Sequence, residues 1–251
     1  MLEPTTISLT LIGVFVIAFI KGGFGGGFAI VGIPLLALVM DPLTAGALLA
    51  PLFVVMDLFA LRYWKPTTWS KPELVVLVPG LLAGIALGTV LLNVLDGRAV
   101  AITISLITLV FSGLWFKGGG EVIVRPRSAP KALTAGVGSG VTTMVAHSGG
   151  PPLALYLLSL GLPKALYAGT TSIFFTLGNI IKMVPWLWVA GTSNELWWLM
   201  AISLPVIPFG VWLGWRLHER LEQKQLYRLC YGLLVITALK LLWNGVSGYL
   251  R

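Results

Sequence analysis

The sequence predicts an all-α integral membrane protein built from two inverted repeats of about five helical segments each. Hydrophobic residues make up 57% of the 251-residue chain and charged residues only 10%, with a mean hydropathy of +0.93. Soluble domains carry about 25% charged residues. Glycine-rich breaks interrupt the apolar runs at corresponding places in two halves. We expect a first membrane repeat at 1–116, a cytoplasmic loop at 117–130 and a second repeat at 131–251.

Ten apolar segments follow one another along the chain. Those of the first half are residues 7–20, 28–40, 43–61, 74–94 and 99–116. Those of the second half are residues 131–146, 150–160, 164–189, 196–217 and 225–247. The last three of each half are long enough to span a hydrocarbon core of about 30 Å. The first two of each half are mostly too short to cross alone, which favours broken or re-entrant helices near the midplane.

Internal similarity suggests that the halves arose by duplication. Three residues of the fourth segment recur 126 positions later in the ninth, with Pro79, Gly84 and Gly88 matching Pro205, Gly210 and Gly214. The glycine breaks at 22–27 and 149–150 are each followed by Pro-Leu. Repeats with such interruptions are typical of secondary transporters.

Basic residues predict how the repeats sit in the membrane. If the first two segments of each half bring the chain back to the same side, eleven basic residues share one side: Arg62, Lys65, Lys71, Lys117, Arg125, Arg127, Lys131, Arg216, Arg220, Lys224 and Arg228. The opposite side then holds only Arg98 and Arg251. The positive-inside rule makes the first side cytoplasmic and places both termini outside. An odd number of crossings per half makes the repeats inverted.

The glycine breaks are the candidate binding site. Five glycines occupy six positions directly after Lys21, namely Gly22, Gly23, Gly25, Gly26 and Gly27. Glycine frees the backbone to leave the helix, and the unpaired N–H groups at a helix start bind anions. The second break, Gly149 and Gly150, offers the same groups. The alternative is that these glycines only allow helices to pack closely.

Two lysines within apolar segments are candidates for neutralising an anion. Lys21 precedes the first break, and Lys182 lies near Asn179. A lysine at the centre of a bilayer costs about 2.5–3.5 kcal/mol unless it is paired or hydrated. The alternative for both is that the side chain extends to the membrane surface.

Further polar residues have both a functional and a structural interpretation. His147 and Asp57 are candidates for proton coupling, although His147 could equally cap the broken helix, and Asp57 is expected to pair with Arg62 near the inner face. Ser148 is a natural N-cap or a substrate ligand. Three consecutive residues with hydroxyl groups form what we call the hydroxyl row, namely Thr170, Thr171 and Ser172. These hydroxyls could bind an oxyanion or form hydrogen bonds to their own helix.

Several classes of function lack any support in the sequence. Two histidines and the single Cys230 are too few and too dispersed for a metal site. The glycine run has no GK[ST] ending, so no nucleotide-binding loop is predicted, and no cofactor. The net charge of +8 reflects membrane loops rather than a nucleic-acid surface. The expected partners are a small anion and the lipid bilayer, and a homo-oligomer stays open.

At these residues the chain resembles the TauE/SafE sulfite exporter family, also called the toluene-sulfonate uptake permease family. The resemblance rests on FIKGGFGGGFAIVGIPLLAL in the first half. It rests also on AGVGSGVTTMVAHSGGPPLALYLLSLGLPKALYAGTTSIFFTLGNIIKMVPW in the second. It covers essentially the full length and implies a multi-pass inner-membrane transporter of sulfite or organosulfonates. Lys21 stands where many relatives carry a small residue, so the substrate cannot be copied over.

The leading hypothesis is therefore secondary transport of a small sulfur-containing anion by alternating access. One alternative is the transport of another small organic anion, such as a carboxylate. A membrane enzyme using His147 with Ser148 is a second alternative, but no oriented carboxylate partner accompanies them. A third is a membrane assembly subunit without transport activity.

Overall fold

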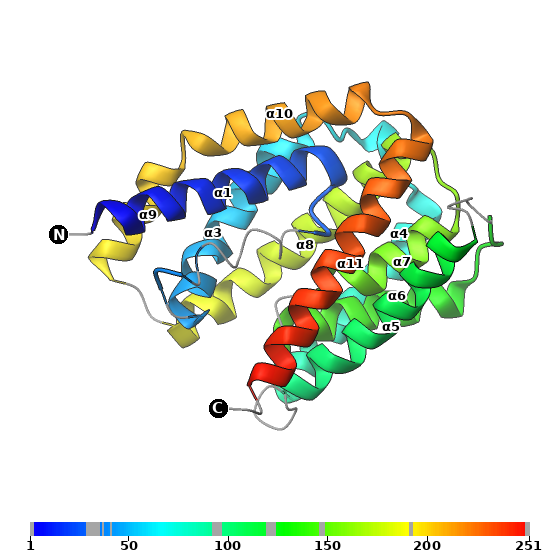
Figure 1. Ribbon diagram of the computed structural model, residues 1–251, viewed down its shortest axis with the longest axis horizontal. Coiled ribbons are helices and arrows are strands. Elements are labelled where there is room, and N and C mark those ends of the chain that lie inside the picture. Colours follow the sequence, from blue (N-terminus) through cyan, green and yellow to red (C-terminus); the bar gives the residue numbers. More distant parts are fainter. Residues whose placement is uncertain are drawn as a thin grey trace.

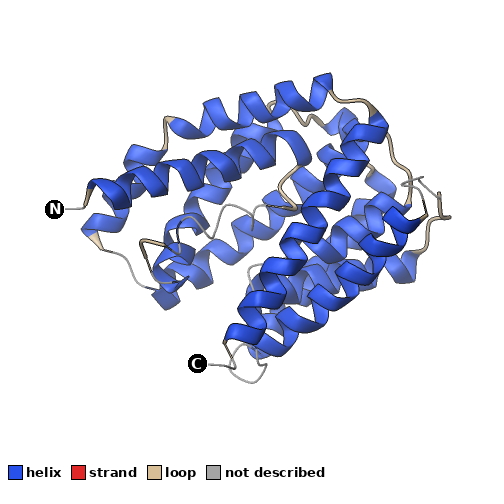
Figure 2. Ribbon diagram, viewed as in Figure 1, coloured by secondary structure: helices blue, strands red, loops and turns tan. Residues whose placement is uncertain are grey.

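The computed structural model describes residues 3–28, 36, 38–40, 42–91, 97–118, 124–145, 149–190 and 193–248. All regular secondary structure in these residues is helical (Figure 2). The helices are α1 (Pro4–Phe24), α3 (Pro42–Leu61), the 3-10 helix η2 (Pro66–Thr68), α4 (Lys71–Leu91), α5 (Gly97–Lys117), α6 (Ala129–Val145), α7 (Gly150–Ser159), α8 (Lys164–Ala190), α9 (Asn194–Ser203), α10 (Val206–Arg220) and α11 (Gln223–Ser247). The expected segment at 28–40 lies mostly outside the described residues.

Helix length and composition confirm a membrane protein. Four of the described helices are long and apolar enough to cross a bilayer, namely α1, α3, α4 and α11, and the pair α9–α10 would be a fifth. Large apolar side chains are exposed on the outside of the bundle, such as Val90 at 76% and Trp243 at 69%. A bundle with such a surface is stable only where lipid covers it.

The structure corrects two of the expected segments. Residues 7–20 were expected to be too short to cross alone, but α1 extends to Phe24 and reaches 21 residues, because Lys21, Gly22 and Gly23 remain helical. The segment 196–217 is not one helix, since α9 and α10 meet at an angle of 42°. The bend lies next to Pro205, which lacks the backbone N–H that would continue the helix.

Helices of one half pack against helices of the other. In Figure 1, α1 lies along α10, and α4 lies with α6 behind α11 and α5. The two remaining major pairs are α5 with α11 and α3 with α8. Suppose that α1 corresponds to α6, α3 to α8, α4 to α9–α10, and α5 to α11. Exchanging the two halves then converts the pair α1–α10 into α4–α6 and leaves the pairs α5–α11 and α3–α8 unchanged. Glycines bring the first two pairs close, since a Cβ at Gly84 would lie 2.3 Å from the Val137 oxygen and one at Gly214 would lie 1.9 Å from the Phe19 oxygen.

Several of the basic loops meet at one end of the bundle. Arg127 forms a 2.9 Å ion pair with Glu73 at the start of α4. Lys164 Nζ donates to the last carbonyls of α10, including that of Leu221 at 2.7 Å, and so complements the negative end of that helix. Tyr63 stacks on Trp215 nearby, with 4.7 Å between ring centroids. Both chain ends lie away from this region in Figure 1.

Candidate functional site

The first glycine break begins later than the sequence suggested. Helix α1 ends at Gly25, whose φ of +75° places it in the left-handed region and whose N–H bonds to the Lys21 carbonyl. Gly26 follows with a φ of +98°. Only glycine adopts two such conformations in succession without strain. The backbone therefore leaves the helix at residues 25–27, one turn after Lys21.

Gly22 and Gly23 serve helix packing. A Cβ at Gly22 would lie 2.0 Å from the Val211 oxygen of α10. The Gly22 carbonyl accepts a 3.1 Å hydrogen bond from the Trp64 indole, and the Gly23 carbonyl lies 2.7 Å from His218 Nδ1. Because both residues are helical, the packing alternative applies to them rather than anion binding. His218, which the sequence did not single out, is a buried structural residue here.

The two glycine breaks touch each other. A Cβ at Gly150 would lie 1.5 Å from the Gly27 oxygen, so only a glycine at position 150 allows this approach. Ser139 Oγ donates to the Gly149 carbonyl at 2.5 Å and holds the start of α7 against α6. His147 and Ser148 lie outside the described residues.

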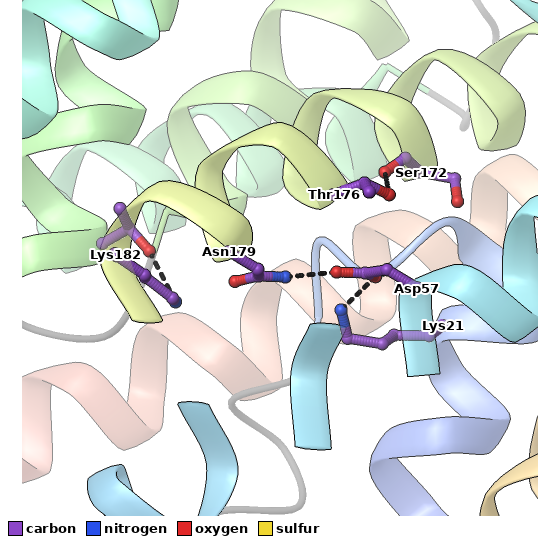
Figure 3. A network of polar contacts seen from close by, with 7 residues as sticks. Lys21, Asp57, Ser172, Thr176, Asn179 and Lys182 are labelled. Atoms are coloured by element: carbon purple, nitrogen blue, oxygen red, sulfur yellow. Dashed lines mark hydrogen bonds and ion pairs between the residues drawn. The ribbon is translucent and has the colours of Figure 1, made fainter. Parts of the chain in front are cut away.

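Lys21, Asp57 and Asn179 form a buried polar cluster beside this contact (Figure 3). Lys21 is 2% exposed and forms an ion pair with Asp57, which is 1% exposed. Asn179 Nδ2 donates to the second carboxylate oxygen of Asp57 at 2.6 Å. The expected pairing of Asp57 with Arg62 is therefore wrong, because Asp57 is turned toward α1 and α8. The alternative in which Lys21 extends to the membrane surface is wrong as well.

Lys182 completes the cluster from the same helix as Asn179. It is 5% exposed, and its amine donates to Thr143 Oγ1 at 3.1 Å. The ring centroid of Phe53 lies 4.9 Å from the Lys21 amine and 5.1 Å from the Lys182 amine, so both ammonium groups contact one aromatic ring. Phe53 and Thr143 were missed by sequence reasoning. Phe53 stands in an unbroken apolar run, whereas Thr143 could have been suspected from its place shortly before the second break.

The hydroxyl row (Thr170, Thr171 and Ser172) divides between the loop before α4 and the first glycine break. Thr170 Oγ1 accepts a 2.8 Å hydrogen bond from the Ser70 backbone, so it anchors the loop before α4. Thr171 and Ser172 lie against the first break, since a Cβ at Gly25 would be 2.9 Å from Thr171 Cβ and 3.0 Å from the Ser172 nitrogen. Both hydroxyls are buried and have no hydrogen-bond partner among the described residues. Two hydroxyls without a hydrogen-bond partner in the described part of the chain thus belong to residues beside the first break.

These groups together suit a small anion. Two ammonium groups and one carboxylate leave a single positive charge when all three are ionised, and unpaired hydroxyls stand nearby. No cluster of three metal-ligating side chains occurs in the part of the chain that the structure describes.

A protein-family model described as "Sulfite exporter TauE/SafE" matches residues 9–241. The chain belongs to the TauE/SafE family. The matched range runs from α1 to the second half of α11 and so includes every residue of the polar cluster. No curated protein and no solved structure matches the chain. Membership of the TauE/SafE family makes the chain a membrane transporter rather than an enzyme, with a small anion as its substrate.

Proposed function

We propose that this TauE/SafE protein is a secondary transporter of sulfite or a small organosulfonate in the inner membrane. The observation that carries the proposal is the pair of buried lysines, Lys21 and Lys182, that share Phe53 beside the contact of the two glycine breaks. The cluster holds one carboxylate, Asp57, and two lysines, so it carries one excess positive charge when all three groups are ionised. Such a charge is costly in a membrane interior, and a bound anion removes the cost.

The donors around the lysines suit an oxyanion such as a sulfonate. Three oxygens of a sulfur oxyanion can accept several hydrogen bonds at once, and the Thr171 and Ser172 hydroxyls have no partner among the described residues. In the same part of the chain Thr143 is the single hydrogen-bond partner of Lys182, so its ammonium group has further N–H donors for a ligand. The backbone of residues 25–27 and 149–150 borders the same space. His147 and Ser148 stay in the proposed site from the sequence pattern alone.

The packing of the helices supports alternating access between inverted repeats. The pair α1–α10 is equivalent to the pair α4–α6 when the two halves are exchanged, and a two-fold axis within the membrane plane requires such equivalence. A cavity of about 600 Å³ between α5, α6 and α7 reaches Gly138 and Pro152, next to the second break. Arg125 and Lys131 also line this cavity, so its basic rim favours the entry of anions. We propose that it is part of the route from the cytoplasmic side.

Transport by purified protein in liposomes tests the proposal. We expect Lys21→Met and Lys182→Met each to lower the uptake of labelled sulfite and methanesulfonate by about tenfold or more, since a charged hydrogen bond contributes about 1.5–3 kcal/mol. Lys240→Met is the matched control, because Lys240 lies on α11 outside the cluster, and its uptake should stay within about twofold of the native protein.

Three results would contradict the proposal. Undiminished uptake in both cluster variants would remove the lysines from the site. Uptake of lactate that excess methanesulfonate does not inhibit would favour the carboxylate alternative. An absence of transport across a panel of anions would favour the assembly subunit.

A further inference from the structure

The charges around Asp57 can be counted element by element. Helix α1 contributes Lys21, helix α8 contributes Lys182 and the neutral Asn179, and helix α6 contributes the neutral Thr143. Among the described residues, the other buried carboxylate is Glu73, which pairs with Arg127 at the basic end. With its three ionisable side chains charged, the cluster thus carries one net positive charge. A bound monoanion brings the total to zero.

Both oxygens of Asp57 are already occupied. One accepts from Lys21 and the other from Asn179, so the carboxylate takes a place beside Lys21 that an anion could otherwise use. Lys182 has no carboxylate partner among the described residues, and it is the cation from which an incoming anion gains most. An anion that contacts Lys182 then lies in the same buried cluster as the negative charge of Asp57.

We propose that Asp57 sets the charge of the anion that this site accepts. A monoanion binds while Asp57 is ionised, and a dianion binds only when a proton from the same side of the membrane neutralises the carboxylate. The proton adds to one Asp57 oxygen, the ion pair with Lys21 is released, and the ammonium group of Lys21 turns to the dianion. The charges of the cluster and of the bound dianion then again sum to zero. This inference rests on the proposed function and adds that the site selects its anions by their charge.

The physical basis is repulsion in a site that water does not screen. Two negative charges a few ångströms apart in a buried cluster repel far more strongly than in bulk water. A second negative charge on the ligand is therefore disfavoured unless Asp57 loses its own. Binding of the dianion is then linked to proton uptake and strengthens as the pH falls.

Sulfate and methanesulfonate form a suitable pair of probes. They have nearly the same tetrahedral shape, they differ by one charge, and neither changes its protonation near neutral pH. Isothermal titration calorimetry on the purified protein in detergent gives both dissociation constants. The native protein should bind methanesulfonate more tightly at neutral pH, and the ratio of the two constants should narrow as the pH falls.

Asp57→Asn removes the negative charge while keeping the shape of the side chain. It should shift the ratio of the two dissociation constants toward sulfate by about tenfold or more. In the same variant the ratio of the two dissociation constants should also change less as the pH falls. Glu73→Gln is the matched control, because it makes the same change in the other buried carboxylate, which pairs with the exposed Arg127. Its ratio should stay within about twofold of the native value.

A double variant covers the case in which Asp57→Asn does not fold. Lys21→Met with Asp57→Asn removes the ion pair as a neutral unit and leaves the positive charge of Lys182. It should still prefer methanesulfonate, with a preference that no longer varies with pH. A native protein that binds both anions, together with an unchanged ratio and pH dependence in these variants, would overturn the role of Asp57 alone. A native protein that binds neither anion would contradict the proposed function itself.

Discussion

At the scale of single residues, three glycines are required where the helices are interrupted. Gly25 and Gly26 take positive φ values at the end of α1. Gly150 lets the backbones of the two halves come into contact at Gly27. At each of these three positions the reason is geometric, since a side chain would meet either a strained backbone or a neighbouring carbonyl. The polar cluster depends on this contact, because it places Lys21 of the first half beside helix α8 of the second.

Gly150→Ala tests the contact between the breaks. The new methyl group would lie 1.5 Å from the Gly27 oxygen, so the two segments must separate. We expect a loss of stability of about 3 kcal/mol, at the upper end of ordinary overpacking. Thermal unfolding in detergent measures it. Gly113→Ala in α5 is the control, because its Cβ would meet nothing within 4 Å; an equal loss in both variants would contradict the contact.

At the scale of the elements, glycine surfaces pair α1 with α10 and α4 with α6. A Cβ at Gly140 would lie 2.5 Å from the Leu81 oxygen, and one at Gly22 would lie 2.0 Å from the Val211 oxygen. Small residues allow such close approach, which favours helix association in lipid through van der Waals contact. Close packing is what the packing alternative expects at these positions, while the chain leaves α1 only at Gly25.

Valine at corresponding positions tests whether the two pairs are equivalent. Gly84→Val in α4 and Gly210→Val in α10 each place a branched side chain against a carbonyl of the partner helix. We expect each to destabilise the protein by about 1–3 kcal/mol and by similar amounts. Gly232→Val in α11, where a Cβ would meet nothing within 4 Å, is the control. A large effect in only one pair, measured by thermal unfolding, would count against a two-fold relation.

At the scale of the whole molecule, one end of the bundle holds the contacts made by Arg127, Lys164 and Tyr63. The chain ends lie elsewhere (Figure 1). Basic residues favour the cytoplasmic side, so this end is expected to face the cytoplasm. The cavity with Arg125 and Lys131 in its lining would then open on that side.

Reporter fusions in cells test this orientation. Alkaline phosphatase fused to the C-terminus should be active, because the end of α11 is expected outside the cytoplasm. A fluorescent protein that folds only in the cytoplasm should not fluoresce when it is fused at the same place. The same two reporters placed after Arg127 should give the reverse result. Activity of the phosphatase after Arg127 would refute the assigned orientation and with it the proposed side of entry.

Much of the molecule could be predicted without coordinates, because hydropathy and charge act locally. The helices at α3, α5, α6, α8 and α11 lie close to their expected segments, since a chain in lipid must satisfy its backbone within each helix. The family followed from two glycine-rich motifs. Lys21, Asn179 and Lys182 were recognised because charged and amide groups inside apolar runs are conspicuous.

The sequence by itself determined the class of the protein and its most unusual side chains, because apolar runs and buried lysines are visible residue by residue. Only the tertiary structure decided which of them meet. Asp57 contacts Lys21 and Asn179 rather than Arg62, which lies five positions later in the chain. Thr170 binds the loop before α4, and Phe53 and Thr143 belong to the cluster although the sequence did not indicate them. Contacts between helices depend on crossing positions and rotations that no local pattern records, and here those were set by glycine contacts between the halves.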